Sequence, residues 1–204
     1  MFTGLIQGIG RIERVERAIA DDARGGVRIT VDGGAVPGFA VAVGDSIALN
    51  GACMTATTVD GARFTADVSA ESLACTTGLD APGMVNIETS LRLGDTIGGH
   101  LVAGHVDGIG TVVRHAPVGE SWELAILAPP ALGRYLAVKG SIAVNGVSLT
   151  VNQVTDTPDG CEFSLNIIPH TRAVTTLGLL QPGARVNLEA DLIARYVERM
   201  LPGR

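Results

Sequence analysis

The chain has 204 residues, of which 46% are hydrophobic and only 3% aromatic, and its formal net charge is −6. Such a chain can bury a core and is not disordered, and its 15 Lys and Arg residues form no basic run, which argues against nucleic-acid binding. No stretch approaches the ~18 apolar residues of a membrane span and the start does not resemble a signal peptide, so we expect a cytoplasmic protein without a membrane partner.

The first half of the chain predicts a set of short strands. Alternating or continuous β-branched residues, separated by turns such as Asn50-Gly51 and Asp60-Gly61, indicate strands at residues 8–15, 27–31, 46–49, 53–59, 63–68 and 84–89. About six strands of this length favour a small closed barrel, because closure removes exposed sheet edges. One short helical turn is expected at 70–74 and another, in the second half, at 171–174.

The second half repeats the plan of the first. "MFTGLIQGIGRI" at Met1 aligns with "LVAGHVDGIGTV" at Leu101, and "NGACMTATTV" at Asn50 recurs as "NGVSLTVNQV" at Asn145. Further blocks follow in the same order, starting at Phe64 and Phe163 and at Pro82 and Pro182. A period of nearly half the chain suits a duplicated domain. We therefore predict an all-β fold with one barrel at 1–97, a second at 98–191 and a C-terminal helix at 192–204.

The predicted C-terminal helix has a one-sided apolar pattern. In "LIARYVERML" the apolar residues that share a helical face are Leu192, Ile193, Tyr196, Val197, Met200 and Leu201. This face either packs on its own barrel or contacts another subunit, and the sequence does not decide between them.

The three cysteines, Cys53, Cys75 and Cys161, form no CxxC pair and no metal-ligand spacing. An odd number of cysteines in a reducing compartment predicts free thiols. We therefore expect no disulfide and no structural zinc.

The repeated strand carries small polar side chains that could bind a ligand. Residues two apart on a strand point to the same side, so Cys53 projects with Thr55, and Ser148 with Thr150. Such groups suit hydrogen bonding to the edge of a flat heterocycle. Taken singly, each residue is more often explained by strand propensity or by packing.

Ionisable residues differ between the halves, as an asymmetric reaction would require. His105, Lys139 and Asp191 stand opposite Leu5, Gly44 and Ser90 of the first half. His105 could equally be a surface histidine, and His115 and His170 give no signal alone. Glu88 and Glu189 occur in both halves and are interpreted as strand-end charges.

Several motifs together resemble the alpha-type riboflavin synthase family over essentially the whole chain. They are "MFTGLIQ", the doubled Asn-Gly strand, "GGHLVAGHVDG" at Gly98 and "HTRAVTTLG" at His170. The resemblance implies two six-stranded Greek-key barrels per subunit, a C-terminal helix and a homotrimer. Each barrel is expected to bind one 6,7-dimethyl-8-ribityllumazine, with the active site between the N-terminal barrel of one subunit and the C-terminal barrel of its neighbour.

The implied reaction is a dismutation of two lumazines, in which one donates a four-carbon unit to the other. The products are riboflavin and 5-amino-6-(ribitylamino)uracil, and the resemblance implies no metal, nicotinamide or flavin cofactor. Association with the preceding enzyme, lumazine synthase, is a further possibility that the sequence leaves open.

The resemblance also assigns site residues, which we group by half. In the first barrel they are Phe2 at the mouth, Gly4, Leu5, Ile6, Cys53, Met54, Thr55, Asp67, Val68, Ser69, Ala70, Glu71 and Ser72. In the second barrel they are Gly104, His105, Val106, Lys139, Ser148, Leu149, Thr150, Asn166, Ile167, Ile168, Pro169, His170 and Thr171. The groups expected to assist deprotonation of the ring methyl or addition at the neighbouring ring carbon are His105, Ser148, Asp191 and Ser46, with Phe2 and Cys53 beside them.

Two positions depart from the family pattern, and two other functions compete. Asn145 stands where Asp is common, and His170 where Glu is common. Lumazine-binding fluorescent proteins share the double barrel as non-catalytic carriers, usually with eroded second-half residues, whereas His105, Lys139, Ser148 and Asp191 are all present here. A flavin-dependent oxidoreductase would need a nicotinamide domain, and no GxGxxG unit opens one.

Overall fold

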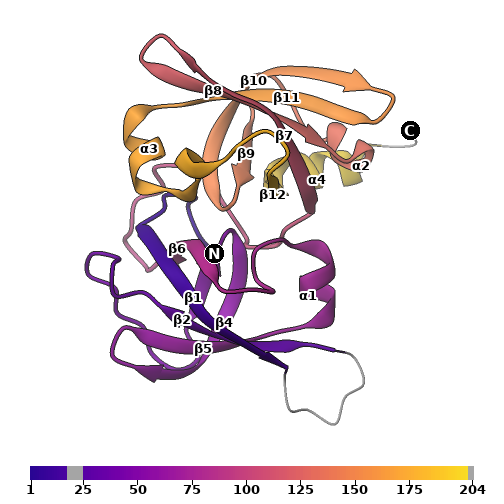
Figure 1. Ribbon diagram of the computed structural model, residues 1–204. Helices are drawn as coiled ribbons and strands as arrows, with labels where there is room; N and C mark the ends of the chain where they lie inside the picture. The colour runs from indigo at the N-terminus through magenta and orange to yellow at the C-terminus, as the bar shows by residue number, and fades with distance from the viewer. Residues whose placement is uncertain (18–24, 202–204) are drawn as a thin grey trace.

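The first barrel forms from the alternating strands of the first half. The computed structural model describes residues 1–17 and 25–201 (Figure 1). The strands of this barrel are β1 Gly8–Arg17, β2 Val27–Asp32, β3 Ser46–Leu49, β4 Ala52–Asp60, β5 Arg63–Val68 and β6 Gly83–Thr89. They close antiparallel in the order β1-β2-β5-β4-β3-β6. All six predicted strands are confirmed, with bounds that differ by no more than two residues.

The second barrel repeats this order with the equivalent strands. Its strands are β7 Gly108–Val118, β8 Ser121–Ala128, β9 Ser141–Val144, β10 Val147–Thr157, β11 Gly160–Ile167 and β12 Arg185–Ala190. They close in the order β10-β11-β8-β7-β12-β9, which is the order of the first barrel read around the ring. The duplication seen in the sequence is therefore a duplication of topology, and the prediction of two closed barrels is confirmed.

Each barrel buries its own aliphatic core around one phenylalanine. Phe64 and Phe163, which align in the two halves, are each 1% exposed among Val, Ile, Leu and Ala side chains. Burial of aliphatic side chains at roughly 25 cal/mol per Å² is the main stabilising contribution in a chain with so few aromatic residues.

Four of the helical segments are short and lie between strands. The predicted turns are α1 Ala70–Cys75 and α3 Pro169–Val174, whereas α2 Pro130–Gly133 and the 3-10 helix η1 Thr176–Leu179 were not predicted. The helices within residues 1–17 and 25–201 are all too short or too polar to cross a membrane.

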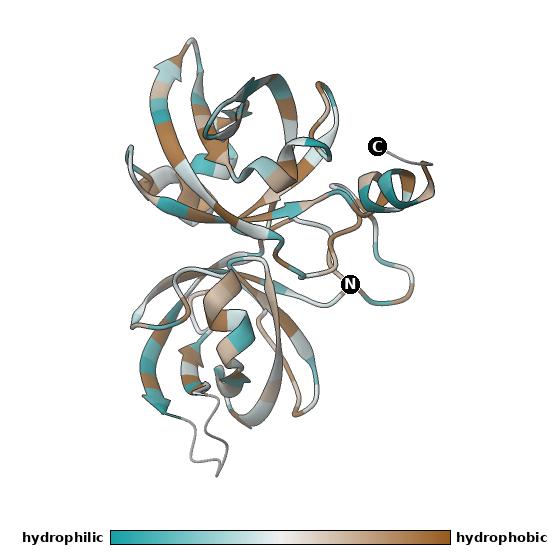
Figure 2. Ribbon diagram, turned by 90° about the vertical axis from the view of Figure 1, so that its right-hand side faces the viewer, coloured by the Kyte–Doolittle hydropathy of each residue, from teal (hydrophilic) through white to brown (hydrophobic). Residues whose placement is uncertain are grey.

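The C-terminal helix α4 Leu192–Met200 turns its polar face toward its own chain. Arg195 donates to the Asp107 carboxylate at 2.7 Å, and Glu198 pairs with Arg134 at 2.9 Å. Ile193 and Met200 on the other face are 65% and 80% exposed, so packing of the apolar face on its own barrel is wrong. In Figure 2 this helix stands to one side of the barrels; residues 202–204 of the predicted 192–204 helix lie outside the described residues.

The two barrels meet through their Asn-Gly turns and the start of the chain. The backbone at Gly51 lies against that of Gly146, and Phe2 forms an isolated antiparallel bridge with Val102. Phe2 is fully buried with Ala48, Val102 and Ala143 in a small cluster between the barrels. Figure 1 accordingly shows the N-terminus between the two barrels.

Candidate functional site

The loop that precedes each barrel reaches across to the other barrel. The Ser148 amide on β10 donates to the Gly4 carbonyl at 2.8 Å, and Ile6 packs on the core of the second barrel. Conversely, the Cys53 amide on β4 donates to the Gly104 carbonyl at 2.9 Å, and Val106 packs on the core of the first barrel. Grouping the site residues by half is therefore wrong, because each site combines a strand of one barrel with a loop of the other.

Glycine is required at the two crossing points. Gly4 and Gly104 have φ of +75° and +80°, which L side chains rarely adopt. A Cβ at Gly4 would lie 2.5 Å from Ser148 Cβ, and one at Gly104 would lie 2.6 Å from Cys53 Cβ. The close approach of loop to strand thus depends on the absence of a side chain.

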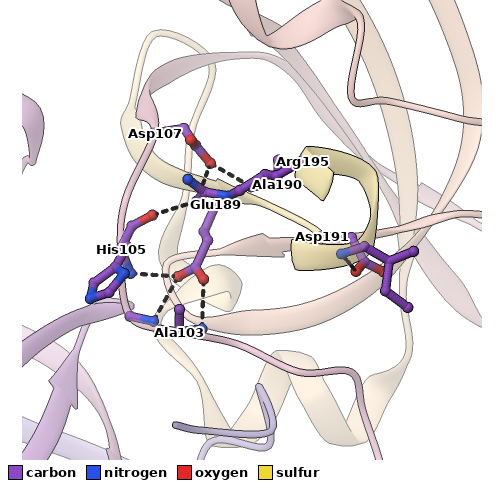
Figure 3. A network of polar contacts seen from close by, with 9 residues as sticks. Ala103, His105, Asp107, Glu189, Ala190, Asp191 and Arg195 are labelled. Atoms are coloured by element: carbon purple, nitrogen blue, oxygen red, sulfur yellow. Dashed lines mark hydrogen bonds and ion pairs between the residues drawn. The ribbon is translucent and has the colours of Figure 1, made fainter. Parts of the chain in front are cut away.

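Two buried carboxylates hold the crossing loops in place. Glu88 is 4% exposed and accepts hydrogen bonds from the Thr3 and Gly4 amides at 2.6 and 3.0 Å. Glu189 is 3% exposed and accepts from the amides of Ala103, Gly104 and His105 at 2.7 to 3.0 Å (Figure 3). Both glutamates lie one residue before the end of their strands, as interpreted from the sequence, but they are buried there.

Burial raises the pKa of Glu88 and of Glu189 above the ordinary value, while the hydrogen bonds from the loop amides act in the opposite direction. Each carboxylate fixes several amides of a loop at once. The two glutamates are therefore structural organisers of the crossing loops.

The first pocket, which we call pocket 1, is a cavity of about 290 Å³ beside Cys53. It is lined by Ala52, Cys53, Met54, Glu71, Ser72, Cys75, Thr76, Gly104, His105 and Val106. The structure thus brings together predicted site residues from both halves, and it places His105 with Cys53 rather than with Ser148. Cys75 and Thr76 were not predicted, because they lie one helical turn beyond the aligned block.

The equivalent position in the second barrel, which we call pocket 2 by analogy with pocket 1, is the outer wall around Ser148, against which the crossing loop with Gly4 lies. His100 lies here, with Nδ1 2.7 Å from the Ser148 hydroxyl. The residue is 9% exposed, and its Nε2 has no hydrogen-bond partner among the described residues. Burial lowers the pKa of His100 below 6.5, so its neutral form, which can accept a proton, predominates at neutral pH.

His100 was missed as a site residue because it directly precedes the aligned block that begins at Leu101 and has no counterpart in the first half. Its place in "GGHLVAGH" beside His105 was the available signal.

The remaining residues that were predicted to be catalytic are Asp191, Ser46 and Phe2. Asp191 caps α4, where its carboxylate accepts from the Ile193 amide at 2.9 Å, and its charge raises the pKa of His100 against the effect of burial. Ser46 on β3 is half-buried and pairs in register with Thr55. Phe2 lies in the buried inter-barrel cluster, with Cys53 packed against it, rather than at an open mouth.

Lys139 is exposed with φ of +67°, where its first-half counterpart Gly44 has φ of +92°. A side chain in the left-handed region costs backbone strain that glycine avoids.

The predicted substrate segments follow the strand alternation. Cys53 and Thr55 share one face of β4, and Ser148 and Thr150 one face of β10, as predicted, and in both strands this is the outer face. The neighbours that face the barrel cores are Met54, Val68, Leu149 and Ile167. The residues that begin or precede the short helices are Ser69, Ala70, Ile168, Pro169, His170 and Thr171, and Ser69 caps α1 by accepting from the Ser72 amide at 3.0 Å.

One pair of aligned residues differs sharply between the barrels. Asp67 is held by Arg28 through two hydrogen bonds of 2.7 and 2.9 Å, and the guanidinium lowers the pKa of this carboxyl. Its counterpart Asn166 pairs in register with Glu123, whose carboxylate is bound by Arg114. The outer wall thus presents a fixed carboxylate in one barrel and an amide in the other.

A larger cavity of about 500 Å³ lies beside the N-terminal loop. It is lined by Leu5, Glu88, Arg92 and Asp95 among others, but by none of the repeated polar strand residues. The repeated strands meet the crossing loops elsewhere, at pocket 1 and at the wall around Ser148.

Comparison with known proteins agrees with this doubled arrangement. The lumazine binding domain family matches residues 3–90 and again residues 103–191. A riboflavin synthase of Mycobacterium bovis is 44% identical over 98% of both chains, and one of Photobacterium phosphoreum is 37% identical over 98% of this chain and 89% of its own. The crystal structure of LumP complexed with 6,7-dimethyl-8-(1'-D-ribityl) lumazine is 25% identical with a TM-score of 0.75, covering 93% of this chain and 99% of LumP.

Proposed function

Since the chain belongs to the lumazine-binding domain family, we propose that it is an enzyme that carries out the riboflavin synthase reaction. Two molecules of 6,7-dimethyl-8-ribityllumazine react, and one transfers a four-carbon unit to the other. The products are riboflavin and 5-amino-6-(ribitylamino)uracil. The observation that carries the proposal is the doubled contact of a repeated polar strand with a crossing loop, because a reaction between two copies of one molecule needs two related sites with different side chains.

The short helices α1 and α3 of the two barrels stand on opposite sides of the molecule in Figure 1. Pocket 1 includes residues of α1, and we place the ligand of the second barrel beside the equivalent helix α3. Two lumazines on one chain would therefore not meet. We place the active site between pocket 1 of one subunit and pocket 2 of its neighbour.

The exposed apolar face of α4 supports assembly with further copies of this chain. Its polar face is already used for contacts with Asp107 and Arg134, so the apolar face is free to pack against the same face of other subunits. We propose a homotrimer joined through α4. Docking of this trimer on lumazine synthase, and a cytoplasmic location in which the three thiols stay reduced, belong to the same proposal.

We assign different roles to the two pockets. In pocket 1, Cys53, Thr55 and the segment from Asp67 to Ser72 bind the ring edge and the ribityl chain. In pocket 2, Ser148, Thr150 and the segment from Asn166 to Thr171 do the same. His100 acts with Ser148 as the base that removes the proton from the ring methyl, with Asp191 nearby, while His105 and Ser46 complete the polar surroundings.

Positioning supplies much of the rate. Holding two rings in register replaces a bimolecular encounter and can contribute roughly 7 to 11 kcal/mol. A positioned base adds about 10² to 10⁴-fold. Both contributions require the two pockets to be held rigidly, as the crossing loops and buried glutamates do.

Incubation of the purified protein with lumazine tests the proposal. We expect one riboflavin and one 5-amino-6-(ribitylamino)uracil for every two lumazines consumed, followed by absorbance and chromatography. Tight binding without turnover would instead identify a non-catalytic carrier.

A second experiment tests the assembly. The double variant Ile193→Glu and Met200→Glu places charges on the exposed apolar face of α4, so it should sediment as a monomer with intact barrels and lose activity. A monomeric variant with full activity would exclude the intersubunit site.

A further inference from the structure

Two buried asparagines connect the barrels in a crosswise manner. Asn86 lies on β6 of the first barrel and Asn187 on β12 of the second, and they are 0% and 1% exposed. Each backbone N–H donates to an acceptor within its own barrel, Asn86 N–H to Asn50 Oδ1 and Asn187 N–H to Asn145 Oδ1, at 2.9 and 2.8 Å. Each side chain instead reaches into the other barrel.

The side chain of Asn187 braces the walls of pocket 1. Its Nδ2 donates to the Asn50 carbonyl at 2.9 Å, in the turn that leads into the strand with Cys53. Its Oδ1 accepts from the Thr77 amide at 2.7 Å, and Nδ2 also donates to the Thr77 carbonyl at 3.2 Å. Thr77 follows α1 and the pocket residue Thr76, so one amide holds two walls of the pocket.

The side chain of Asn86 makes the corresponding contacts at pocket 2. Its Nδ2 donates to the Asn145 carbonyl at 2.9 Å, in the turn that leads to Ser148. Its Oδ1 accepts from the Thr176 amide at 2.8 Å, just after α3. The arrangement is therefore the same for both pockets, with the roles of the barrels exchanged.

We propose that Asn86 and Asn187 are positioning residues that act crosswise, each setting the geometry of the pocket in the opposite barrel. A buried amide that fixes two backbone segments leaves unsatisfied groups when it is removed, and those segments then shift. Because the own-barrel hydrogen bonds use backbone N–H groups, truncating either side chain removes only the bonds across the interface. The inference rests on the proposed function, in that both pockets bind lumazine-type rings.

Thiol reactivity provides a reporter for each pocket. Cys53 and Cys75 line pocket 1, whereas burial raises the pKa of Cys161 to about 11 and keeps it unreactive. For pocket 2, the variant Ser148→Cys in a Cys53→Ser, Cys75→Ser background places a thiol at the aligned position. Riboflavin is the probe, and the measured quantity is the riboflavin concentration that half-protects each thiol from a maleimide.

We expect Asn187→Ala to raise the half-protecting concentration for pocket 1 by about tenfold or more, with little change at pocket 2, because it removes the three hydrogen bonds of this amide to Asn50 and Thr77. Asn86→Ala should do the reverse. The matched control is Asn152→Ala on β10, a half-buried asparagine, which should leave both values within about twofold of the wild type.

A purely structural role would weaken both pockets alike or mainly the pocket of the mutated barrel, and either result overturns the inference. If the alanine variants do not fold, hydrogen exchange on the unmodified chain replaces them: riboflavin should slow exchange at the Thr77 and Thr176 amides, and unchanged exchange there would also overturn it. Failure of riboflavin to protect any wild-type thiol would refute the pockets themselves, whereas protection without crossed effects would refute only the crosswise action.

Discussion

The two barrels share a scaffold but differ in the side chains that face a ligand. Strand order, crossing loop, buried glutamate and bracing asparagine all occur twice. In contrast, pocket 1 presents the thiol of Cys53, and pocket 2 presents the hydroxyl of Ser148 with His100 beside it. Under the proposed function, the common features are expected to hold two identical molecules in equivalent positions, and the few differences are proposed to decide which molecule loses a proton.

The largest expected effect separates the pockets by their acid-base groups. His100→Ala and Ser148→Ala should each lower kcat by about 10² to 10⁴-fold, because they remove the proposed base or its hydroxyl partner. Cys53→Ala, at the position aligned with Ser148, should have a much smaller effect on kcat. An equal decrease of kcat in all three variants, measured by steady-state kinetics, would contradict the assignment of the base to pocket 2.

The crossing glycines should show the next largest effect. Gly104→Ala should destabilise the fold by about 1 to 3 kcal/mol and weaken binding at pocket 1, since its Cβ would strike Cys53. Gly4→Ala should do the same at pocket 2. Gly94→Ala is the matched control, because Gly94 also has positive φ but no atom lies within 4 Å of an added Cβ. The measurement is the melting temperature in thermal unfolding. An equal decrease in all three variants would show that the strain of a positive φ, and not the contact with the strand, causes the loss of stability.

A moderate effect of pH follows from the lowered pKa of His100. Above pH 6.5 this histidine is neutral in both folded and unfolded chains, so its contribution to stability is fully present. As the pH falls below 6.5, the unfolded chain binds a proton that the folded chain resists, and that contribution is lost. Between pH 7.5 and pH 5.5, the free energy of unfolding measured by denaturant titration should therefore fall less in His100→Asn than in the wild type. The opposite ranking would mean that the folded chain favours the charged imidazole.

The smallest expected effect concerns the exposed ion pairs on the outer walls. Arg28→Ala and Arg114→Ala should both change the melting temperature little, because solvent screens these pairs. Only Arg28→Ala releases Asp67 from its ion pair. This variant should therefore raise the riboflavin concentration that half-saturates pocket 1 a few-fold. Equal effects of the two variants on riboflavin binding would remove Asp67 from the site.

Much of the fold could be predicted from the sequence. Strand alternation, Asn-Gly turns and the internal repeat identified both barrels, because these signals are local or depend on comparing one half with the other. The short helix α2 was missed, since a four-residue helix leaves no periodic pattern.

The site was harder to predict, because its defining contacts join residues far apart in the chain. Aligning the halves correctly paired Cys53 with Ser148 but placed Gly4 and Gly104 with the wrong strands. Only the hydrogen bonds of Cys53 to Gly104 and of Ser148 to Gly4 reveal the exchange. The same limit hid Glu88 and Glu189, whose burial depends on loops about 85 residues away in the sequence.

The seating of the first residues between the barrels has a consequence for synthesis of the protein. Phe2 pairs with Val102, and Gly4 contacts Ser148, so this segment can dock only after residues about 100 and 145 positions later in the chain have been translated. Barrel closure can proceed in the nascent chain, but docking of the N-terminal segment cannot.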